Sequence, residues 1–153
     1  MRAGTRLNVR GIDDDGNVSN FVEQEQIVKI NTMNYAFVST RGSVPIFWSQ
    51  GNNKNEGNLY EDVQITRSTE MTREAFQKHF QSMTDDYQFV QIIDLLKDKR
   101  EREKKLTREY YRLFRESEFK QEGQLDFLHF DFASFVKGDK FQALRILLQQ
   151  TRK

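Results

Sequence analysis

Residues 89–96 read FVQIIDLL, a nearly continuous apolar run of strand length, and this stretch decides the fold class. Apolar side chains on both faces are typical of a strand buried inside a parallel sheet. Residues 125–132, LDFLHFDF, form a second strand candidate whose side chains alternate between two faces, with His129 and Asp131 on the same one. The two stretches therefore predict neighbouring strands of one sheet.

Apolar residues at helical spacing flank both strand candidates. Residues 71–87 predict a helix, with Thr72 as its N-cap and Glu74 in its first turn. Residues 97–117 and 141–148 predict two more helices. The resulting order of helix, strand, helix, strand, helix is that of a parallel α/β sheet.

The first 48 residues carry strand patterns instead. Strand candidates begin near Leu7 and Val18, and the run DDDGN at 13–17 supplies the Asp-Gly turn between them. Residues 35–40 and 44–48 predict further strands. This half is expected to form an antiparallel β-meander, which makes the whole chain a mixed α/β (α+β) fold.

Residues 49–62, SQGNNKNEGNLYED, are polar and lack an apolar period, so they predict an exposed loop. They form the best internal boundary of what is expected to be a single domain. The predicted organisation is a β-rich part over 1–48, a loop over 49–62 and an α/β part over 63–153.

The composition excludes several classes of function. A chain of 153 residues with a formal net charge of +1 has no overall field that would attract nucleic acid. It contains no cysteine, which excludes disulfides, thiolate metal sites and a cysteine nucleophile within this sequence. No apolar run is long enough for a membrane span and no signal peptide is recognisable, so the cytoplasm is the expected compartment.

Two charged segments invite functional interpretations that their spacing does not support. The run at 13–17 places Gly16 fourth from Asp13, whereas a helix–loop–helix calcium site needs glycine at its sixth position. The spacing therefore favours a hairpin turn, and neither a metal nor another cofactor is expected. The basic segment 97–108, KDKREREKKLTR, interleaves acidic residues and contains a favourable Glu101–Lys105 pair, which favours a solvated helix face and no nucleic-acid partner.

The two histidines and the arginines are the remaining candidates for chemistry. His79 lies at the edge of an apolar helical stripe and is expected to be structural, and the polar site that His129 could share with Asp131 has little support from the residues alone. Arg6 and Arg10 point to the same side of a strand, and guanidinium groups bind phosphate through two parallel hydrogen bonds. From the residues alone, surface salt bridges between these arginines, Arg41 and the glutamates at 23 and 25 are the favoured alternative.

Four segments, in order along nearly the whole chain, favour phosphate binding by these arginines over surface salt bridges. They are RAGTRLNVRGIDDDGNVSNFVEQEQI at 2–27, RGSVPIFWSQ at 41–50, ITRSTEMTREAFQKHF at 65–80 and LHFDFASFVKGDKFQAL at 128–144. Together they resemble the Sac phosphoinositide phosphatase family, and the last is similar to the synaptojanin-like branch.

The resemblance implies hydrolysis of phosphate monoesters on the inositol ring of phosphoinositides by a Cys-x5-Arg loop that follows the α/β block. Because this sequence starts directly on RAGTR and stops at Lys153 without that loop, it is expected to be a partial Sac domain without the N-terminal subdomain and without catalytic residues. The expected function is that of an inactive fragment of a phosphoinositide phosphatase. The alternative is a nonenzymatic remnant that binds phosphoinositide head groups or a protein partner.

The resemblance also carries expectations for individual residues. Family positions expected to support the substrate cleft are Arg6, Arg10, Asn20, Glu23, Glu25, Arg41 and Asp131. Ser19, Gln24 and Ala133 depart from the family pattern, and the alanine stands where a histidine is common. The expected partners are phosphoinositide lipids at a membrane surface, together with self-association through open strand edges.

Overall fold

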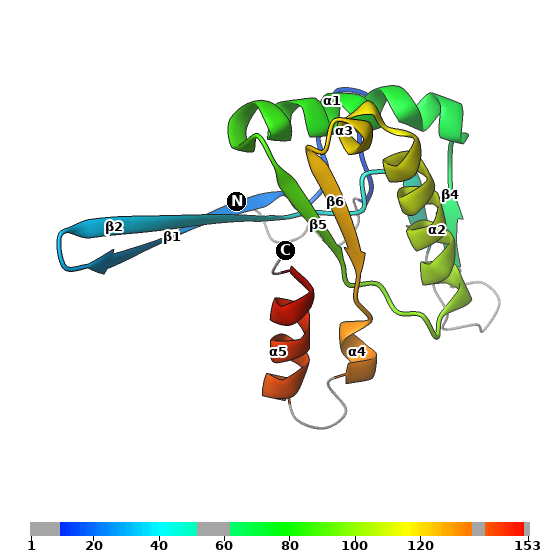
Figure 1. Ribbon diagram of the computed structural model, residues 1–153. Helices are drawn as coiled ribbons and strands as arrows, with labels where there is room; N and C mark the ends of the chain where they lie inside the picture. The colour runs from blue at the N-terminus through cyan, green and yellow to red at the C-terminus, as the bar shows by residue number, and fades with distance from the viewer. Residues whose placement is uncertain (1–9, 52–61, 136–139, 152–153) are drawn as a thin grey trace.

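The computed structural model describes residues 10–51, 62–135 and 140–151, and it confirms the mixed α/β class (Figure 1). The elements are β1 (Val22–Ile30), β2 (Met33–Arg41), β3 (Trp48–Gly51), β4 (Asp62–Ile65), α1 (Thr69–Tyr87), β5 (Val90–Asp94), α2 (Glu101–Glu116), α3 (Glu118–Gln121), β6 (Leu125–His129), α4 (Phe132–Phe135) and α5 (Lys140–Thr151). The strands pair as β1–β2 and β3–β4, both antiparallel, and as β5–β6, which is parallel. The predicted strand at Leu7 lies outside the described residues.

The parallel pair β5–β6 lies at the centre of the main hydrophobic core. Helix α1 packs against β5 and helix α2 packs against β6. Phe76, Phe80 and Leu106 are at most 2% exposed, because each lies on the apolar helix face that its period predicted, and Leu125 at the start of β6 is also 2% exposed. The α/β arrangement predicted from FVQIIDLL is therefore confirmed.

The first residues of helices α1 and α2 differ from the predicted ones. Helix α1 is capped by Ser68, whose hydroxyl accepts a hydrogen bond from the Met71 amide at 3.4 Å, so the prediction of Thr72 as N-cap was wrong. Thr72 is buried inside the helix and donates its hydroxyl to the Ser68 carbonyl at 2.8 Å. Glu70, not Glu74, is the acidic residue of the first turn.

Helix α2 starts at Glu101, four residues after the predicted start, because residues 97–100 form a separate loop. The Lys97 amide donates to the Glu103 carboxylate at 2.9 Å, which holds that loop against the first turn of the helix. Glu101 pairs with Lys104 at 3.1 Å, one residue before the predicted Lys105. Pairs such as this one lie on the solvent face of α2, which fits the solvated face predicted for the basic segment.

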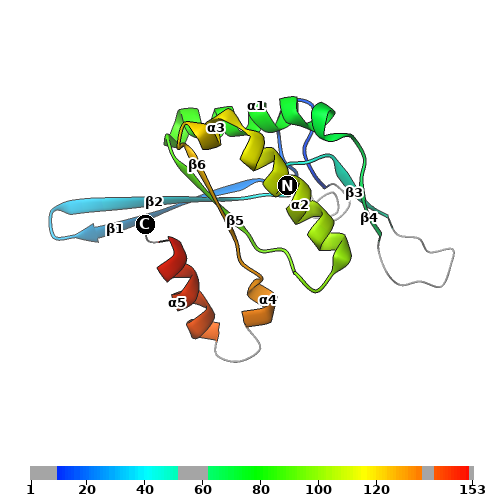
Figure 2. The same cartoon turned by 45° about the vertical axis from the view of Figure 1, so that its right-hand side comes forward.

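The β1–β2 hairpin projects away from the rest of the molecule in both views (Figures 1 and 2). Its nine-residue strands pair from Val22 with Arg41 to Ile30 with Met33, and a two-residue turn at 31–32 joins them. Asn31 adopts a positive φ of 55°, which hairpin turns of this length require. The sequence placed the first of these strands near Val18, where the structure has only an isolated bridge to Ile12.

The turn predicted at 13–17 is confirmed. The carboxylate of Asp13 accepts hydrogen bonds from the amides of Asp15 at 3.0 Å and Asn17 at 2.8 Å, and Gly16 takes a φ of +87°. A Cβ on Gly16 would approach the backbone of His79 to 2.8 Å, so this turn packs closely against helix α1.

Two predicted strands end or begin elsewhere. The strand predicted at 44–48 was wrong: residues 44–47 form a bend around Pro45, which has no amide to donate to a ladder, and β3 starts at Trp48. Strands β3 and β4 also occupy both ends of the predicted 49–62 loop, whose residues 52–61 lie outside the described part of the chain. At the other end of the molecule β6 stops at His129, because the Asp131 carboxylate accepts from the Ser134 amide at 3.0 Å and starts helix α4.

Candidate functional site

A groove with a cavity volume of about 510 Å³ runs along β5. Residues 90–96 line one side and residues 40–45, from the end of β2 and the loop after it, line the other. Helix α1 adds His79 and Met83, and α5 adds Leu147. Volumes of this size are usual for small-molecule sites in proteins.

The loop that forms the second wall is fixed by backbone and side-chain hydrogen bonds. The Ser43 hydroxyl accepts from the Gly11 amide at 2.8 Å, and the Ser43 amide donates to the Ser19 carbonyl at 2.8 Å. A Cβ on Gly42 would come within 2.6 Å of the Val18 side chain, so only glycine fits this approach without displacement. The position of Arg41, the residue before this glycine, is therefore set by the turn at 11–19.

Arg41 is the cationic side chain of the groove. It is exposed at the end of β2, and within the described residues its guanidinium makes no hydrogen bond or ion pair. A guanidinium fork that lacks a protein partner is suited to a ligand oxyanion.

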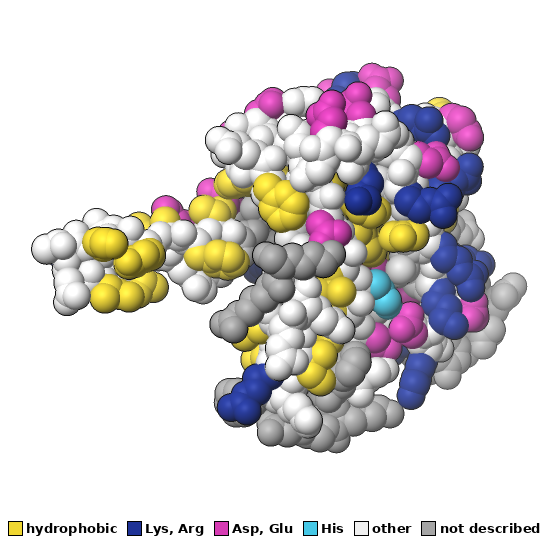
Figure 3. Space-filling view, viewed as in Figure 1, with side chains coloured by type: hydrophobic (Ala, Val, Ile, Leu, Met, Phe, Trp, Pro, Cys, Tyr) yellow, Lys and Arg dark blue, Asp and Glu magenta, His cyan; other side chains and the backbone are white. Residues whose placement is uncertain are grey.

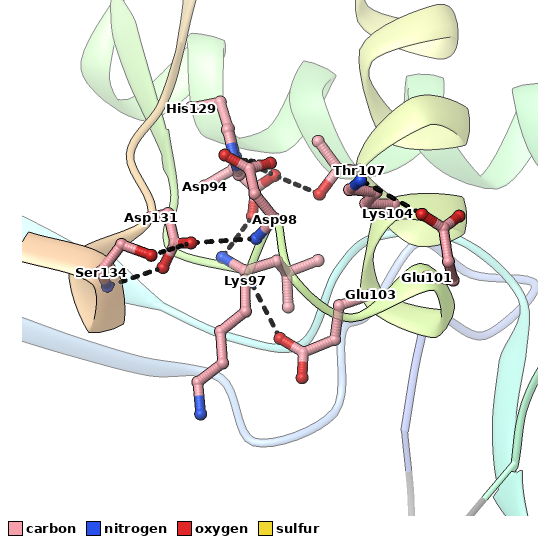
Figure 4. Close-up of polar contacts among 11 residues, drawn as sticks. Asp94, Lys97, Asp98, Glu101, Glu103, Lys104, Thr107, His129, Asp131 and Ser134 are labelled. Atoms are coloured by element: carbon pink, nitrogen blue, oxygen red, sulfur yellow. Dashed lines mark hydrogen bonds and ion pairs between the residues drawn. The ribbon is translucent and has the colours of Figure 1, made fainter.

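A polar cluster occupies the carboxyl ends of β5 and β6 (Figure 4). The Asp94 side chain is only 2% exposed, and its carboxylate contacts His129 Nδ1 at 3.0 Å. It also accepts from the Thr107 hydroxyl at 2.8 Å and from the Leu96 amide at 3.0 Å. These contacts satisfy a carboxylate whose burial would otherwise be costly.

The cluster continues from His129 to the loop before α2. His129 Nε2 lies 3.0 Å from the Asp98 carboxylate, so both ring nitrogens face carboxylate oxygens. The Asp98 amide donates to the Asp131 carboxylate at 3.1 Å, and the Ser134 hydroxyl donates to it at 2.6 Å. The Ser134 hydrogen bond lowers the pKa of Asp131. Three carboxylates against one imidazole disfavour an anionic ligand here, so the cluster orders the end of the sheet.

The predicted site residues fall in three places. Arg6 lies outside the described residues. Arg10 is half-buried and directly precedes Gly11, whose amide bonds Ser43, so the segments of Arg10 and Arg41 lie side by side. Whether these arginines contact substrate together stays a prediction.

The acidic and amide members of the predicted set lie apart from one another. Asn20 precedes β1 with a positive φ of 60°, and Glu25 is exposed on the projecting hairpin. Glu23, at the hairpin base, accepts a hydrogen bond from the Tyr87 hydroxyl at the end of α1, which raises the pKa of Tyr87 to about 12. Asp131 belongs to the cluster at the end of β6.

Sequence reasoning missed the members of this cluster other than His129 and Asp131. The signal for Asp94 is its place as the one charged residue in FVQIIDLL, because a carboxylate in a buried strand must find partners. Asp98 and Thr107 gave no such signal, since both lie among polar neighbours. His79 has the structural role expected of it: its Nδ1 lies 3.0 Å from the Gly16 carbonyl, and burial lowers its pKa.

These features define a mixed α/β domain with a groove beside a parallel sheet, which Arg41 lines from the end of strand β2. The family model described as the SacI homology domain matches residues 1–137, so the chain belongs to that family. No helix in the described ranges is both long and apolar enough to cross a bilayer.

Individual relatives agree with this family. The chain is 38% identical over 148 residues to polyphosphatidylinositol phosphatase INP53 of Saccharomyces cerevisiae, covering 96% of this chain and 13% of the relative. It is 37% identical over 148 residues to human synaptojanin-1, covering 97% of this chain and 9% of the relative. It is 49% identical over 96 residues to inositol-1,4,5-trisphosphate 5-phosphatase 1 of Schizosaccharomyces pombe, covering 63% of this chain and 9% of the relative. The chain thus spans about a tenth of the length of these curated relatives.

Proposed function

We propose that this chain is part of a phosphoinositide phosphatase domain and that its groove contacts the inositol phosphate head group through Arg41. The observation that carries the proposal is the Arg41 guanidinium, which lines the groove and makes no ion pair within the described residues. The family and the names of two relatives, a polyphosphatidylinositol phosphatase and an inositol trisphosphate phosphatase, support the choice of ligand.

The surroundings of Arg41 favour phosphate recognition over a structural ion pair. Val22, its neighbour across the hairpin, is apolar, and the loop that follows is pinned by Ser43. The backbone beside Arg41 is fixed in this way, and the guanidinium that it carries can form two parallel hydrogen bonds to a phosphate. Arg6 and Arg10 are proposed as further phosphate contacts, with Asn20, Glu23, Glu25 and Asp131 as supports of the surrounding structure.

The chemical step of the family mechanism requires a cysteine thiolate, and this sequence contains no cysteine. We therefore expect the chain by itself to bind head groups without releasing phosphate. In this respect the fragment of a phosphatase and the nonenzymatic remnant behave alike. The lipid ligand also implies peripheral membrane contact from the cytoplasmic side.

Binding is tested with vesicles that contain phosphatidylinositol phosphates, and with soluble inositol phosphates to separate head-group recognition from membrane contact. We expect a dissociation constant on the order of 0.1 to 1 mM, because one or a few arginines act without a complete phosphate-binding loop. Arg41→Ala should weaken binding at least tenfold, and Arg41→Lys by less, since a charge-assisted hydrogen bond contributes about 1.5–3 kcal/mol. Raising the salt concentration should weaken the wild type more than Arg41→Ala.

The matched control replaces Lys97, Lys104 and Lys105 with alanine, which removes three charges from helix α2 and the loop before it at residues that do not line the groove. If this control abolishes binding and Arg41→Ala does not, the basic segment is the lipid-facing surface and the groove assignment is wrong. Release of inorganic phosphate by the purified chain would contradict the expectation of binding without turnover.

A further inference from the structure

The outer edge of strand β1 is an unpaired strand edge on a projecting arm. Among the described strands β1 pairs only with β2, and its residues from Glu23 to Ile30 are all exposed. Figure 3 shows hydrophobic side chains gathered on this arm. Ile27 is 66% exposed, although isoleucine is among the residues most often buried. An exposed edge of this length is a template for pairing with another strand.

The charges along this edge have a two-fold pattern. Glu25 and Lys29 lie at equal distances on either side of Ile27, and the three residues share one face because side chains alternate along a strand. Their neighbours across the hairpin, Val38, Ala36 and Asn34, carry no charge. Neither charged residue therefore has a cross-strand ionic partner within the hairpin.

We propose that two copies of this chain associate by pairing β1 with β1 of the second copy, antiparallel and centred on Ile27. In this register Glu25 lies opposite Lys29 of the second copy, Lys29 lies opposite its Glu25, and the two Ile27 side chains meet on the axis. The same patch thus serves both copies, as a two-fold interface requires. The result is a four-stranded antiparallel sheet in the order β2, β1, β1, β2.

The backbone of the hairpin is set for this register. Residues in an antiparallel pair alternate between those whose amide and carbonyl face the partner strand and those whose groups face away. The two-residue turn makes Ile30 and Met33 a hydrogen-bonded pair, so the amide and carbonyl of Ile30 face β2. Because these groups alternate in direction along a strand, the amides and carbonyls of Glu25, Ile27 and Lys29 face the free edge. The residues that complement one another in charge are therefore also the ones that offer hydrogen bonds.

A second copy fits this edge better than a bilayer does. Glu23 and Glu25 balance Lys29 and Arg41, so the hairpin has no net charge to draw it to anionic lipid. Both edges of the hairpin lack a partner strand among the described residues, and they would leave backbone groups unpaired in hydrocarbon, where each costs several kcal/mol. Pairing between copies satisfies one of those edges in each chain.

The first test uses the absence of native cysteine. Ile27→Cys should form a covalent dimer under mild oxidation, because residues facing each other across an antiparallel pair lie about 5.5 Å apart at Cα, within disulfide range. The control is Ala36→Cys, which places an exposed thiol on the same face at the same height of the hairpin. Across three strand spacings the thiols of this control variant lie about 14 Å apart in the two copies, beyond disulfide reach. Equal cross-linking of both variants would overturn the proposal.

The second test swaps charges and measures self-association by sedimentation. Glu25→Lys or Lys29→Glu alone places like charges opposite each other at two symmetric positions and should weaken association about tenfold. The double variant restores opposite charges and should recover the affinity of the wild type. A wild type that stays monomeric at every concentration, a double variant that remains weak, or association that needs added vesicles or another protein would each overturn the proposal.

Discussion

The α/β body, which consists of strands β5 and β6 with helices α1, α2 and α3 packed on them, contains the same kinds of apolar side chain as the β1–β2 hairpin. The two regions place these side chains in opposite environments. Phe76 and Phe80 on helix α1 are 1% and 2% exposed, whereas Phe37 on β2 is 66% exposed. In the body a second layer of helices covers the sheet, and within the described residues nothing covers the hairpin. The comparison shows that a strand pattern specifies pairing and face, while burial depends on a neighbouring layer.

The largest expected contrast is between the same substitution in the two regions. Phe76→Ala removes a buried ring from the core and should lower the free energy of unfolding by about 3–5 kcal/mol. Phe37→Ala changes an exposed ring and should alter it by no more than about 0.5 kcal/mol. Urea unfolding of both variants at low protein concentration measures this difference. A comparable loss for Phe37→Ala would mean that the hairpin is covered in the folded chain.

A smaller effect is expected at the polar end of the body. Asp94→Asn should destabilise the fold by about 1.5–3 kcal/mol, because the buried carboxylate accepts from His129, Thr107 and the Leu96 amide. Asp98→Asn is the matched control, since that side chain is 60% exposed and contacts the other nitrogen of the same imidazole. It should cost less than about 1 kcal/mol. Equal losses in thermal or urea unfolding would show that burial does not distinguish the two carboxylates.

The smallest effect concerns the contact that joins the two regions, between Tyr87 of α1 and Glu23 at the hairpin base. The pKa of Tyr87 is raised from 10.0 to about 12, so the contact is intact below pH 10 and is lost as the pH rises toward 12. Tyrosine absorbance during alkaline titration should therefore change in Glu23→Gln, with one phenol titrating at lower pH. Glu25→Gln should leave the titration unchanged, and an equal shift in that variant would contradict the assigned partner.

The element types were predictable where a single local rule acts. The periods of 71–87 and 97–117 predicted α1 and α2, and the Asp-Gly signal predicted the turn at 13–17. The predicted boundaries of helices and strands were wrong where a capping side chain sets the end of the element, because the spacing of apolar residues carries no information on caps. Ser68 caps α1 three residues before the predicted Met71 start, and Asp131 ends β6 by capping α4.

The candidate site was predictable only in part. Arg41 was singled out from the chemistry of guanidinium and from family resemblance, and it lines the groove. Asp94 and Asp98 were not, because their roles come from one histidine that contacts both carboxylates across the ends of two strands and a loop. Glu25 entered the predicted set with Glu23, yet only Glu23 is close enough to the body to contact Tyr87.

The sequence by itself determined the α/β class, the parallel pair of strands, the absence of a cysteine nucleophile and the SacI homology family, because periodicity, composition and motif order are properties of the chain. Only the tertiary structure decided that Arg41 faces a groove along β5, that three carboxylates gather around His129, and that β1 presents a free edge. Each of these depends on contacts between residues far apart along the chain or on the lack of a covering layer, and no local pattern encodes either.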